Sequence, residues 1–202
     1  MNIGFIGLGK LGGPVVEAIR EAGHSVVGYD VNGSGVDSIE NCVKDSEIVF
    51  VAVPTPHDPA YDGKYVCSDL EPKDFDYTIA RDVLIEADKY MIKDQLLVLI
   101  STVLPGTTRE HFEPNVKNAT FIYNPYLIAM GTVGWDMLNP EMVMIGTKKG
   151  NPDTAVLAKK LESMYLQMCD NMPRVEIGSW EEVEAIKIFY NTFISAKLSL
   201  VN

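Results

Sequence analysis

Residues 1–13 read MNIGFIGLGKLGG, and this stretch decides the fold. Its first part is apolar and predicts a buried strand over residues 2–7. Gly7, Gly9 and Gly12 then fit the spacing G-x-G-x-x-G. Glycines at this spacing, directly after a strand, indicate a tight turn that opens a helix.

A helix and a second strand follow these glycines. Residues 11–22 repeat apolar side chains at helical spacing, and the apolar stretch 25–30 ends in Asp30. The order of strand, glycine turn, helix, strand and acid predicts a unit that binds a dinucleotide. A carboxylate at this position accepts hydrogen bonds from ribose hydroxyls and repels a 2′-phosphate, so Asp30 favours NAD over NADP.

Each part of this fingerprint has a physical role. Gly7 permits the turn, Gly9 lets a pyrophosphate approach the backbone, and Gly12 lets the helix pack closely on the strand. The first N–H groups of the helix and the positive end of its dipole then face the phosphates. The cofactor-binding residues predicted from this unit are Gly7, Gly9, Lys10, Leu11, Gly12 and Asp30.

The composition excludes several classes of protein. The chain has 202 residues, of which 47% are hydrophobic, and fits one large domain or one domain with a short extension. Its net charge of −11 argues against binding to nucleic acid or to an anionic membrane. The 3 cysteines lack metal-ligand spacing, and no targeting segment or long apolar stretch is seen. These features predict a cytoplasmic protein without a metal site.

Strand and helix patterns alternate along the rest of the chain. Residues 31–46 leave room for only one small helix, so we expect the first half of the sheet to lack its outer strand. The alternation predicts an α/β fold with a doubly wound, mostly parallel Rossmann-type sheet and helices on both faces. Strands are expected at 47–53, 95–101, 119–123, 143–146 and 174–177, helices at 75–91, 105–112, 153–168 and from 180 onward, and an irregular loop at 124–139.

Three of the expected strands end in polar loops that contain proline. These loops are Val53–Pro56, Ser101–Thr108 and Tyr123–Tyr126. Because ligands bind outside the carboxyl ends of the strands in open α/β sheets, we expect the three loops to lie at a binding edge.

These segments, in this order, resemble the amino-terminal domain of the UDP-glucose/GDP-mannose dehydrogenase family. The resemblance rests on the fingerprint, Val53–Pro56, Ser101–Thr108, Asn124–Pro125 and a helix with Lys187 and Asn191. It implies an NAD-dependent oxidoreductase that oxidises the 6-hydroxymethyl of a nucleotide sugar to a carboxylate in two hydride transfers. It also implies a homodimer in the complete enzyme.

The resemblance further implies roles for individual residues. Val53, Pro54, Thr55 and Thr102 would lie at the cofactor, and a threonine of this kind also contacts a catalytic water. Lys187 and Asn191 are four apart and share one helix face. A lysine there can neutralise a developing alkoxide while the asparagine donates a hydrogen bond, so the predicted catalytic residues are Lys187, Asn191 and Thr102.

Two features of the chain depart from the family. Tyr126 and Met130 occupy the positions after Asn-Pro where the family has two glutamates. The nucleophilic cysteine of the family follows the helix at 180–202, and Cys42, Cys67 and Cys169 lie in other contexts. Without that thiol the step from aldehyde to acid has no covalent route, so we expect this chain to be the cofactor-binding part and inactive alone.

The expected organisation has two parts. Residues 1–178 form the NAD-binding domain, and residues 179–202 form the start of a connecting helix. Because the chain ends inside an uncapped helical pattern, we expect it to be truncated.

Two other functions stay open. The first 32 residues also resemble β-hydroxyacid dehydrogenases of the 3-hydroxyisobutyrate type, which share Ser101–Pro105 and the Lys and Asn pair but lack a Val53–Pro56 turn. A module that binds NAD without turnover of its own is the other alternative.

Overall fold

Seven strands form one sheet in the computed structural model, which describes residues 1–64 and 69–201. The strand order is β2-β1-β3-β4-β5-β6-β7, and every neighbouring pair is parallel except β5 and β6. The expected mostly parallel sheet is therefore confirmed. Its strands are β1 (Asn2–Ile6), β2 (Ser25–Tyr29), β3 (Ile48–Val51), β4 (Leu96–Leu99), β5 (Thr120–Tyr123), β6 (Met142–Thr147) and β7 (Arg174–Ser179).

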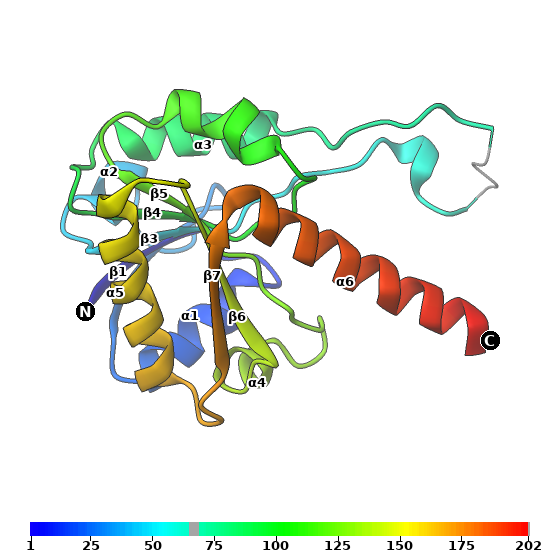
Figure 1. The fold of residues 1–202 in the computed structure, drawn as a ribbon. Coiled ribbons are helices and arrows are strands. Elements are labelled where there is room, and N and C mark those ends of the chain that lie inside the picture. Colours follow the sequence, from blue (N-terminus) through cyan, green and yellow to red (C-terminus); the bar gives the residue numbers. More distant parts are fainter. Residues whose placement is uncertain (65–68, 202) are drawn as a thin grey trace.

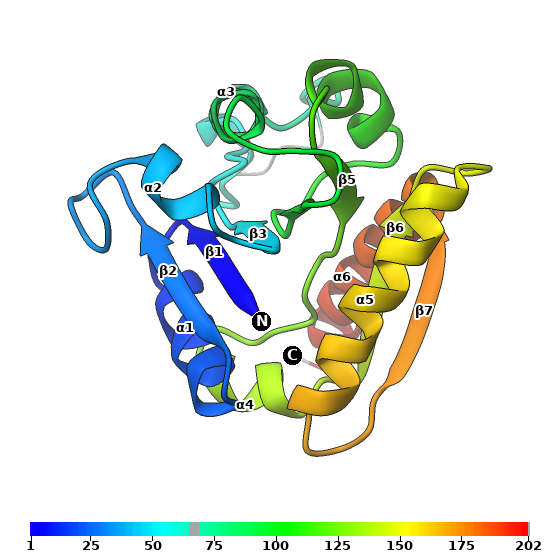
Figure 2. The ribbon, with the colours of Figure 1, turned by 90° about the vertical axis from the view of Figure 1, so that its left-hand side faces the viewer.

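Helices cover both faces of this sheet (Figures 1 and 2). One face carries α1 (Gly12–Glu21), α4 (Val133–Leu138) and α5 (Pro152–Met168), and the other carries α2 (Ile39–Val43) and α3 (Thr78–Asp88). The long helix α6 (Trp180–Val201) follows β7, and its second half projects away from the sheet (Figure 1). No helix among the described residues is long and apolar enough to cross a membrane.

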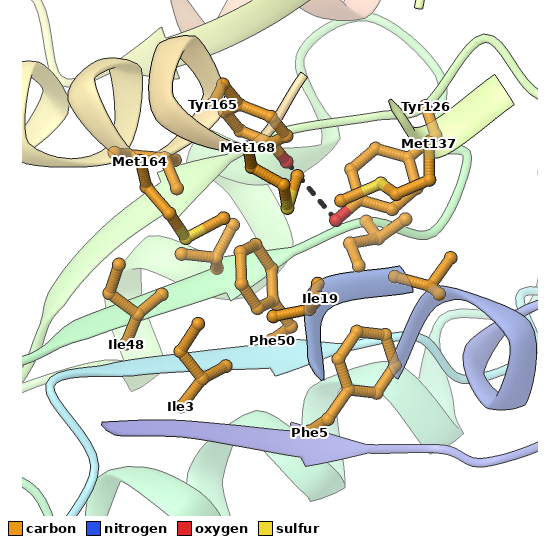
Figure 3. Packing of buried hydrophobic residues seen from close by; sticks show 14 of the residues in the cluster. Ile3, Phe5, Ile19, Ile48, Phe50, Tyr126, Met137, Met164, Tyr165 and Met168 are labelled. Atoms are coloured by element: carbon orange, nitrogen blue, oxygen red, sulfur yellow. Dashed lines mark hydrogen bonds between the residues drawn. The ribbon is translucent and has the colours of Figure 1, made fainter. Parts of the chain in front are cut away.

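The core lies on both faces because the strands are apolar without interruption. Every residue of β3, β4 and β5 is buried, as is usual for parallel strands covered on both sides. Alternate side chains of one strand therefore enter different clusters. Phe50 packs toward α1 and α5 with Met164 (Figure 3), whereas Val49 packs toward α3 with Leu84.

The first half of the sheet is shortened, as expected. β2 is an edge strand, and the chain crosses directly to β3 on the other side of β1. The intervening residues form a tight turn with a bridge between Tyr29 and Gly35, and then α2. The Ser38 Oγ caps α2 by accepting a hydrogen bond from the Asn41 N–H at 3.2 Å.

The structure corrects the expectation for residues 124–139. This stretch contains α4, because Val133 and Met137 share one helical face and pack into the core. The helix is short, and flanking glycines and prolines obscured its period. The strand that follows it, β6, is antiparallel to β5, with Tyr123 opposite Gly146.

A buried carboxylate joins the end of α3 to the start of β5. Asp88 is 4% exposed and accepts hydrogen bonds from the N–H groups of Lys117 at 2.7 Å and Ala119 at 2.8 Å. It also accepts from the Asn118 N–H at 3.1 Å. One side chain therefore satisfies three donors in the turn that leads into a central strand.

We predict that Asp88→Ala lowers the free energy of unfolding by about 2–4 kcal/mol, because three backbone donors lose a charged acceptor. Asp82→Ala is the matched control, since Asp82 lies on the same helix but is exposed and pairs only with Arg81. Its expected effect is within about 0.5 kcal/mol. Urea unfolding measures both, and similar midpoints for the two variants would contradict the prediction.

Candidate functional site

The parallel sheet brings the predicted loops to one edge. Gly7 follows β1, Asp30 follows β2, Val53 follows β3 and Thr102 follows β4. These strands are parallel and adjacent, so their carboxyl ends lie side by side. Residues far apart in the chain therefore line a row of adjoining cavities at this edge.

The first of these, the fingerprint cavity, has a volume of about 460 Å³. Every predicted cofactor-binding residue except Thr55 and Thr102 lines it, namely Gly7, Gly9, Lys10, Leu11, Gly12, Asp30, Val53 and Pro54. The structure thus gathers the fingerprint, the acid after β2 and the turn after β3 around one space.

The glycines of the fingerprint shape this cavity as a dinucleotide requires. A Cβ on Gly12 would lie 1.8 Å from the Gly7 carbonyl oxygen, so only glycine lets α1 begin this close to the turn. Gly7 has φ +100°, which also requires glycine. A Cβ on Gly9 would meet nothing within 4 Å, so the backbone there is open to a bound group. No side chain in the described part of the chain caps α1, which suits phosphate at its N-terminus.

Asp30 is already oriented by the backbone around it. Its Oδ2 accepts a hydrogen bond from the Leu8 N–H at 2.7 Å, and its Oδ1 accepts from the Asn32 N–H at 3.0 Å. Each carboxylate oxygen can accept more than one hydrogen bond, so capacity for ribose hydroxyls remains. The residues present therefore fit a dinucleotide whose ribose lies at Asp30.

Several apolar residues of the cavity wall were not among the predicted site residues. Tyr29, Ile39, Ile79 and Val83 line the fingerprint cavity from β2, α2 and α3. The sequence pattern placed Ile79 and Val83 on one face of the 75–91 helix together with the core residue Leu84, yet Ile79 is 46% exposed. Helical spacing alone does not separate a cavity wall from a core.

A second space, the junction cavity, adjoins the first and has a volume of about 280 Å³. Leu11, Ala52 and Val53 line both cavities. Thr102 and Lys187 lie together in the junction cavity. The structure therefore brings one residue from the loop after β4 and one from α6 to the end of the fingerprint cavity.

Hydroxyl groups hold the loop that carries Thr102. The Thr55 Oγ1 donates a hydrogen bond to the Thr102 carbonyl at 2.7 Å, and the Ser101 Oγ donates to the Val53 carbonyl at 2.5 Å. Thr55 lines neither the fingerprint cavity nor the junction cavity. Its hydroxyl proton orients the neighbouring loop, and its predicted contact with a cofactor stays a prediction.

Lys187 is buried, with 8% of its surface exposed. Its Nζ donates a hydrogen bond to the Tyr126 carbonyl at 2.7 Å. Burial lowers the pKa of this ammonium group below its ordinary value, because the charged form loses solvation. The ammonium group of Lys187 is therefore held in one orientation, and it loses its proton more readily than an exposed lysine does.

A chain of buried hydroxyl groups fixes the turn that presents the Tyr126 carbonyl (Figure 3). The Tyr126 and Tyr165 hydroxyls are 3.2 Å apart, and the Tyr165 hydroxyl donates to the Asn124 Oδ1 at 2.5 Å. The Asn124 Nδ2 donates to the Met144 carbonyl at 2.7 Å. The phenol of Tyr126 thus enters the core and offers the cavity only its backbone.

The outer cavity lies beyond Lys187 and has a volume of about 730 Å³. Lys187 and Asn191 both line it, so the predicted catalytic pair shares one space. Glu141 also lines it and accepts a hydrogen bond from the Tyr190 hydroxyl at 2.9 Å. The sequence did not predict Glu141 as a site residue, because its carboxylate comes to the outer cavity from the start of β6.

The described cysteines lie away from these cavities. Cys42 and Cys169 are free and buried, and burial raises the pKa of each thiol to about 11. Neither lines the fingerprint, junction or outer cavity. Cys67 lies outside the described residues.

Several curated relatives match the whole chain. An uncharacterized protein of Methanocaldococcus jannaschii is 27% identical, over 100% of this chain and 25% of its own length. The UDP-glucose 6-dehydrogenase AglM of Haloferax volcanii is 24% identical, over 100% of this chain and 53% of its own length. The chain therefore spans about a quarter of the first relative and half of the second.

A solved structure shares the fold. A ternary complex of GDP-mannose dehydrogenase from Pseudomonas aeruginosa superposes with a TM-score of 0.81 at 21% identity. The match covers 99% of this chain and 51% of that chain. The chain thus has the fold of one half of that enzyme.

The burial of Lys187 predicts a shifted titration. Its pKa in the folded chain lies below the ordinary value of 10.5, so the unfolded chain keeps this proton over a pH range in which the folded chain has lost it. The contribution of Lys187 to stability therefore rises with pH between these two pKa values. NMR of ¹³C-labelled lysine, with Lys187→Arg to assign the signal, measures the shift. Equal midpoints in folded and urea-unfolded protein would contradict the prediction.

A family model assigns the chain to a known protein family. The model described as the UDP-glucose/GDP-mannose dehydrogenase family, NAD binding domain, matches residues 36–169, which is more than half of the chain. The match begins after the glycine fingerprint, so it supports the same conclusion from other residues. The chain belongs to the UDP-glucose/GDP-mannose dehydrogenase family and carries its NAD-binding domain.

Proposed function

We propose that this chain is the cofactor-binding part of an enzyme that oxidises the 6-hydroxymethyl of a nucleotide sugar. The observation that carries the proposal is the junction between cavities. The fingerprint cavity adjoins the junction cavity, which Thr102 and Lys187 both line, and Lys187 lines the outer cavity together with Asn191. The relatives that carry a functional name include a UDP-glucose 6-dehydrogenase and a UDP-N-acetyl-D-mannosamine dehydrogenase.

The fingerprint cavity would bind NAD⁺, which supplies a hydride acceptor when bound. The open backbone at Gly9 and the start of α1 would hold the pyrophosphate, with Lys10 as a nearby cation. Asp30 would accept hydrogen bonds from the adenosine ribose. Val53 and Pro54 line the path from this end toward Thr102.

Lys187 and Asn191 would act on the reacting oxygen. An ammonium group has three donors, and the Tyr126 carbonyl uses one of them. The remaining donors can stabilise an alkoxide in a site shielded from water, where such interactions are strong. The lowered pKa of Lys187 also eases its release of a proton. Asn191 would donate a further hydrogen bond from the same helix face.

The second oxidation needs a nucleophilic thiol, which these cavities do not hold among the described residues. Tyr126 buries its phenol in the core, Met130 has no acidic group, and no described cysteine lines the site. We therefore propose that this chain alone binds NAD⁺ without turnover. The division into residues 1–178 and 179–202 stays part of this proposal.

Location and assembly are proposals of the same kind. Buried free thiols at Cys42 and Cys169 support a reducing, cytoplasmic setting. The net charge of −11 supports a protein that does not bind nucleic acid. Exposed apolar residues on the projecting half of α6, such as Phe193 and Leu198, support a homodimer in the complete enzyme.

The first test separates binding from turnover. We expect NAD⁺ to raise the melting temperature of the chain, because a ligand that binds only the folded state stabilises it. We expect no NADH from UDP-glucose or related UDP-sugars with the chain alone. NADH formed from a small hydroxyacid would favour a β-hydroxyacid dehydrogenase. No melting shift with millimolar NAD⁺ would contradict the proposal.

A second test concerns the ribose contact. Asp30→Ala should weaken NAD⁺ binding by about 1.5–3 kcal/mol for each charged hydrogen bond lost. Asp37→Ala is the matched control, because Asp37 follows the same strand but lies on the surface, where it accepts a hydrogen bond from the Asn41 side chain. Lys187→Ala should leave NAD⁺ affinity intact. Calorimetric titration measures all three, and an unchanged dissociation constant for Asp30→Ala would exclude the ribose role.

A further inference from the structure

Glu184 is a buried carboxylate to which the proposed chemistry assigns no role. It is 0% exposed and lies on α6, one turn before Lys187. One of its oxygens accepts a hydrogen bond from the Gly106 N–H at 2.6 Å, and the other accepts from the Thr108 N–H at 2.7 Å. Both donors belong to residues 101–108, the loop that carries Thr102, here called the Thr102 loop.

Backbone donors offset the cost of burying this charge. No lysine or arginine in the described ranges forms an ion pair with Glu184, and the nearby Arg109 pairs with Glu181. The Thr108 N–H belongs to the first residue of a helical turn at Thr108–Phe112, where backbone donors lack helical partners, and the Gly106 N–H lies two residues before it. Since buried charges are costly unless they are bonded, the position of the carboxylate depends strongly on these two contacts.

The helix α6 therefore meets the sheet edge through two opposite charges. Glu184 bonds N–H groups of the Thr102 loop, and Lys187 bonds the Tyr126 carbonyl in the loop after β5. One turn before Glu184 the helix lies close to β6, where a Cβ on Gly146 would be 3.3 Å from the Trp180 Cα. These contacts fix the helix relative to both loops.

We propose that Glu184 is a positioning residue, which holds the Thr102 loop against α6 and so keeps Thr102 and Lys187 at the same cavity. The inference rests on the proposed function, because it takes the nicotinamide ring to lie beside Thr102. Other contacts hold the loop on its opposite side, where the Tyr77 hydroxyl accepts from the Leu104 N–H at 3.2 Å. Glu184 ties the backbone of the loop to the helix that carries Lys187.

The proposal predicts an effect on one end of the cofactor only. Glu184 does not line the fingerprint cavity, so binding of the adenine, ribose and pyrophosphate groups should not depend on it. ADP-ribose has these groups without the nicotinamide ring. The preference of the chain for NAD⁺ over ADP-ribose therefore reports how well the Thr102 loop is placed.

Glu184→Gln tests this directly, because one carboxylate oxygen becomes an amide group that cannot accept from an N–H. Glu181→Gln is the matched control, since Glu181 lies on the same helix and bonds the Arg109 side chain rather than the loop backbone. Calorimetry of each chain with NAD⁺ and with ADP-ribose gives the two affinities. Amide hydrogen exchange at Gly106 and Thr108 measures how well the hydrogen bonds to residue 184 protect these two loop amides.

We expect faster exchange at both amides in Glu184→Gln, a preference for NAD⁺ that falls by about fivefold, and an ADP-ribose affinity within about twofold of wild type. Glu181→Gln should behave as wild type. If Glu184→Gln does not fold, Glu184→Asp is used, which keeps the charge but is one methylene shorter.

Three results would overturn the inference. The first is unchanged amide exchange, and the second is an equal loss of affinity for both ligands, which would show a merely structural role. The third is a wild-type chain without preference for NAD⁺ over ADP-ribose. Failure of the complete enzyme to oxidise a nucleotide sugar would count against the proposed function alone, because neither measurement needs turnover.

Discussion

No side chain fits between the start of α1 and the turn that leaves β1. A Cβ on Gly12 would lie 1.8 Å from the Gly7 carbonyl oxygen, so the helix can begin directly on the sheet only because both residues are glycine. This contact places the N–H groups of the helix start at the carboxyl edge of the strands. The fingerprint cavity is built around that placement, and past Val53 it adjoins the junction cavity, which Thr102 lines.

The other end of the site depends on how α6 meets the sheet. The helix brings two buried charges, Glu184 and Lys187, and each bonds main-chain atoms of a different loop. Backbone groups are good partners for such charges because their positions are fixed by the strands that they follow. The same burial that fixes Lys187 also lowers its pKa, so position and proton affinity have one cause.

Much of the fold and of the fingerprint cavity could be predicted from local sequence patterns. Continuous apolar runs predicted the buried strands, and the glycine spacing with Asp30 predicted residues that now line a single cavity. The pattern did not reveal the contacts that tertiary structure decides. Thr55 directs its hydroxyl at the Thr102 carbonyl, Tyr126 buries its phenol against Tyr165, and α4 is stabilised by a core that its own residues do not reveal.

The glycine turn and the shortened first half are local properties, because φ angles and apolar periodicity depend on neighbours in the chain. The state of Lys187 and Glu184 is not local. Their hydrogen-bond partners lie 61 and 78 residues away, and in a helical pattern both residues look like surface charges. Only the folded sheet removes water from these two side chains and gives each of them a backbone hydrogen-bond partner. The replacement of water by backbone groups decides which charged residues are fixed at the site.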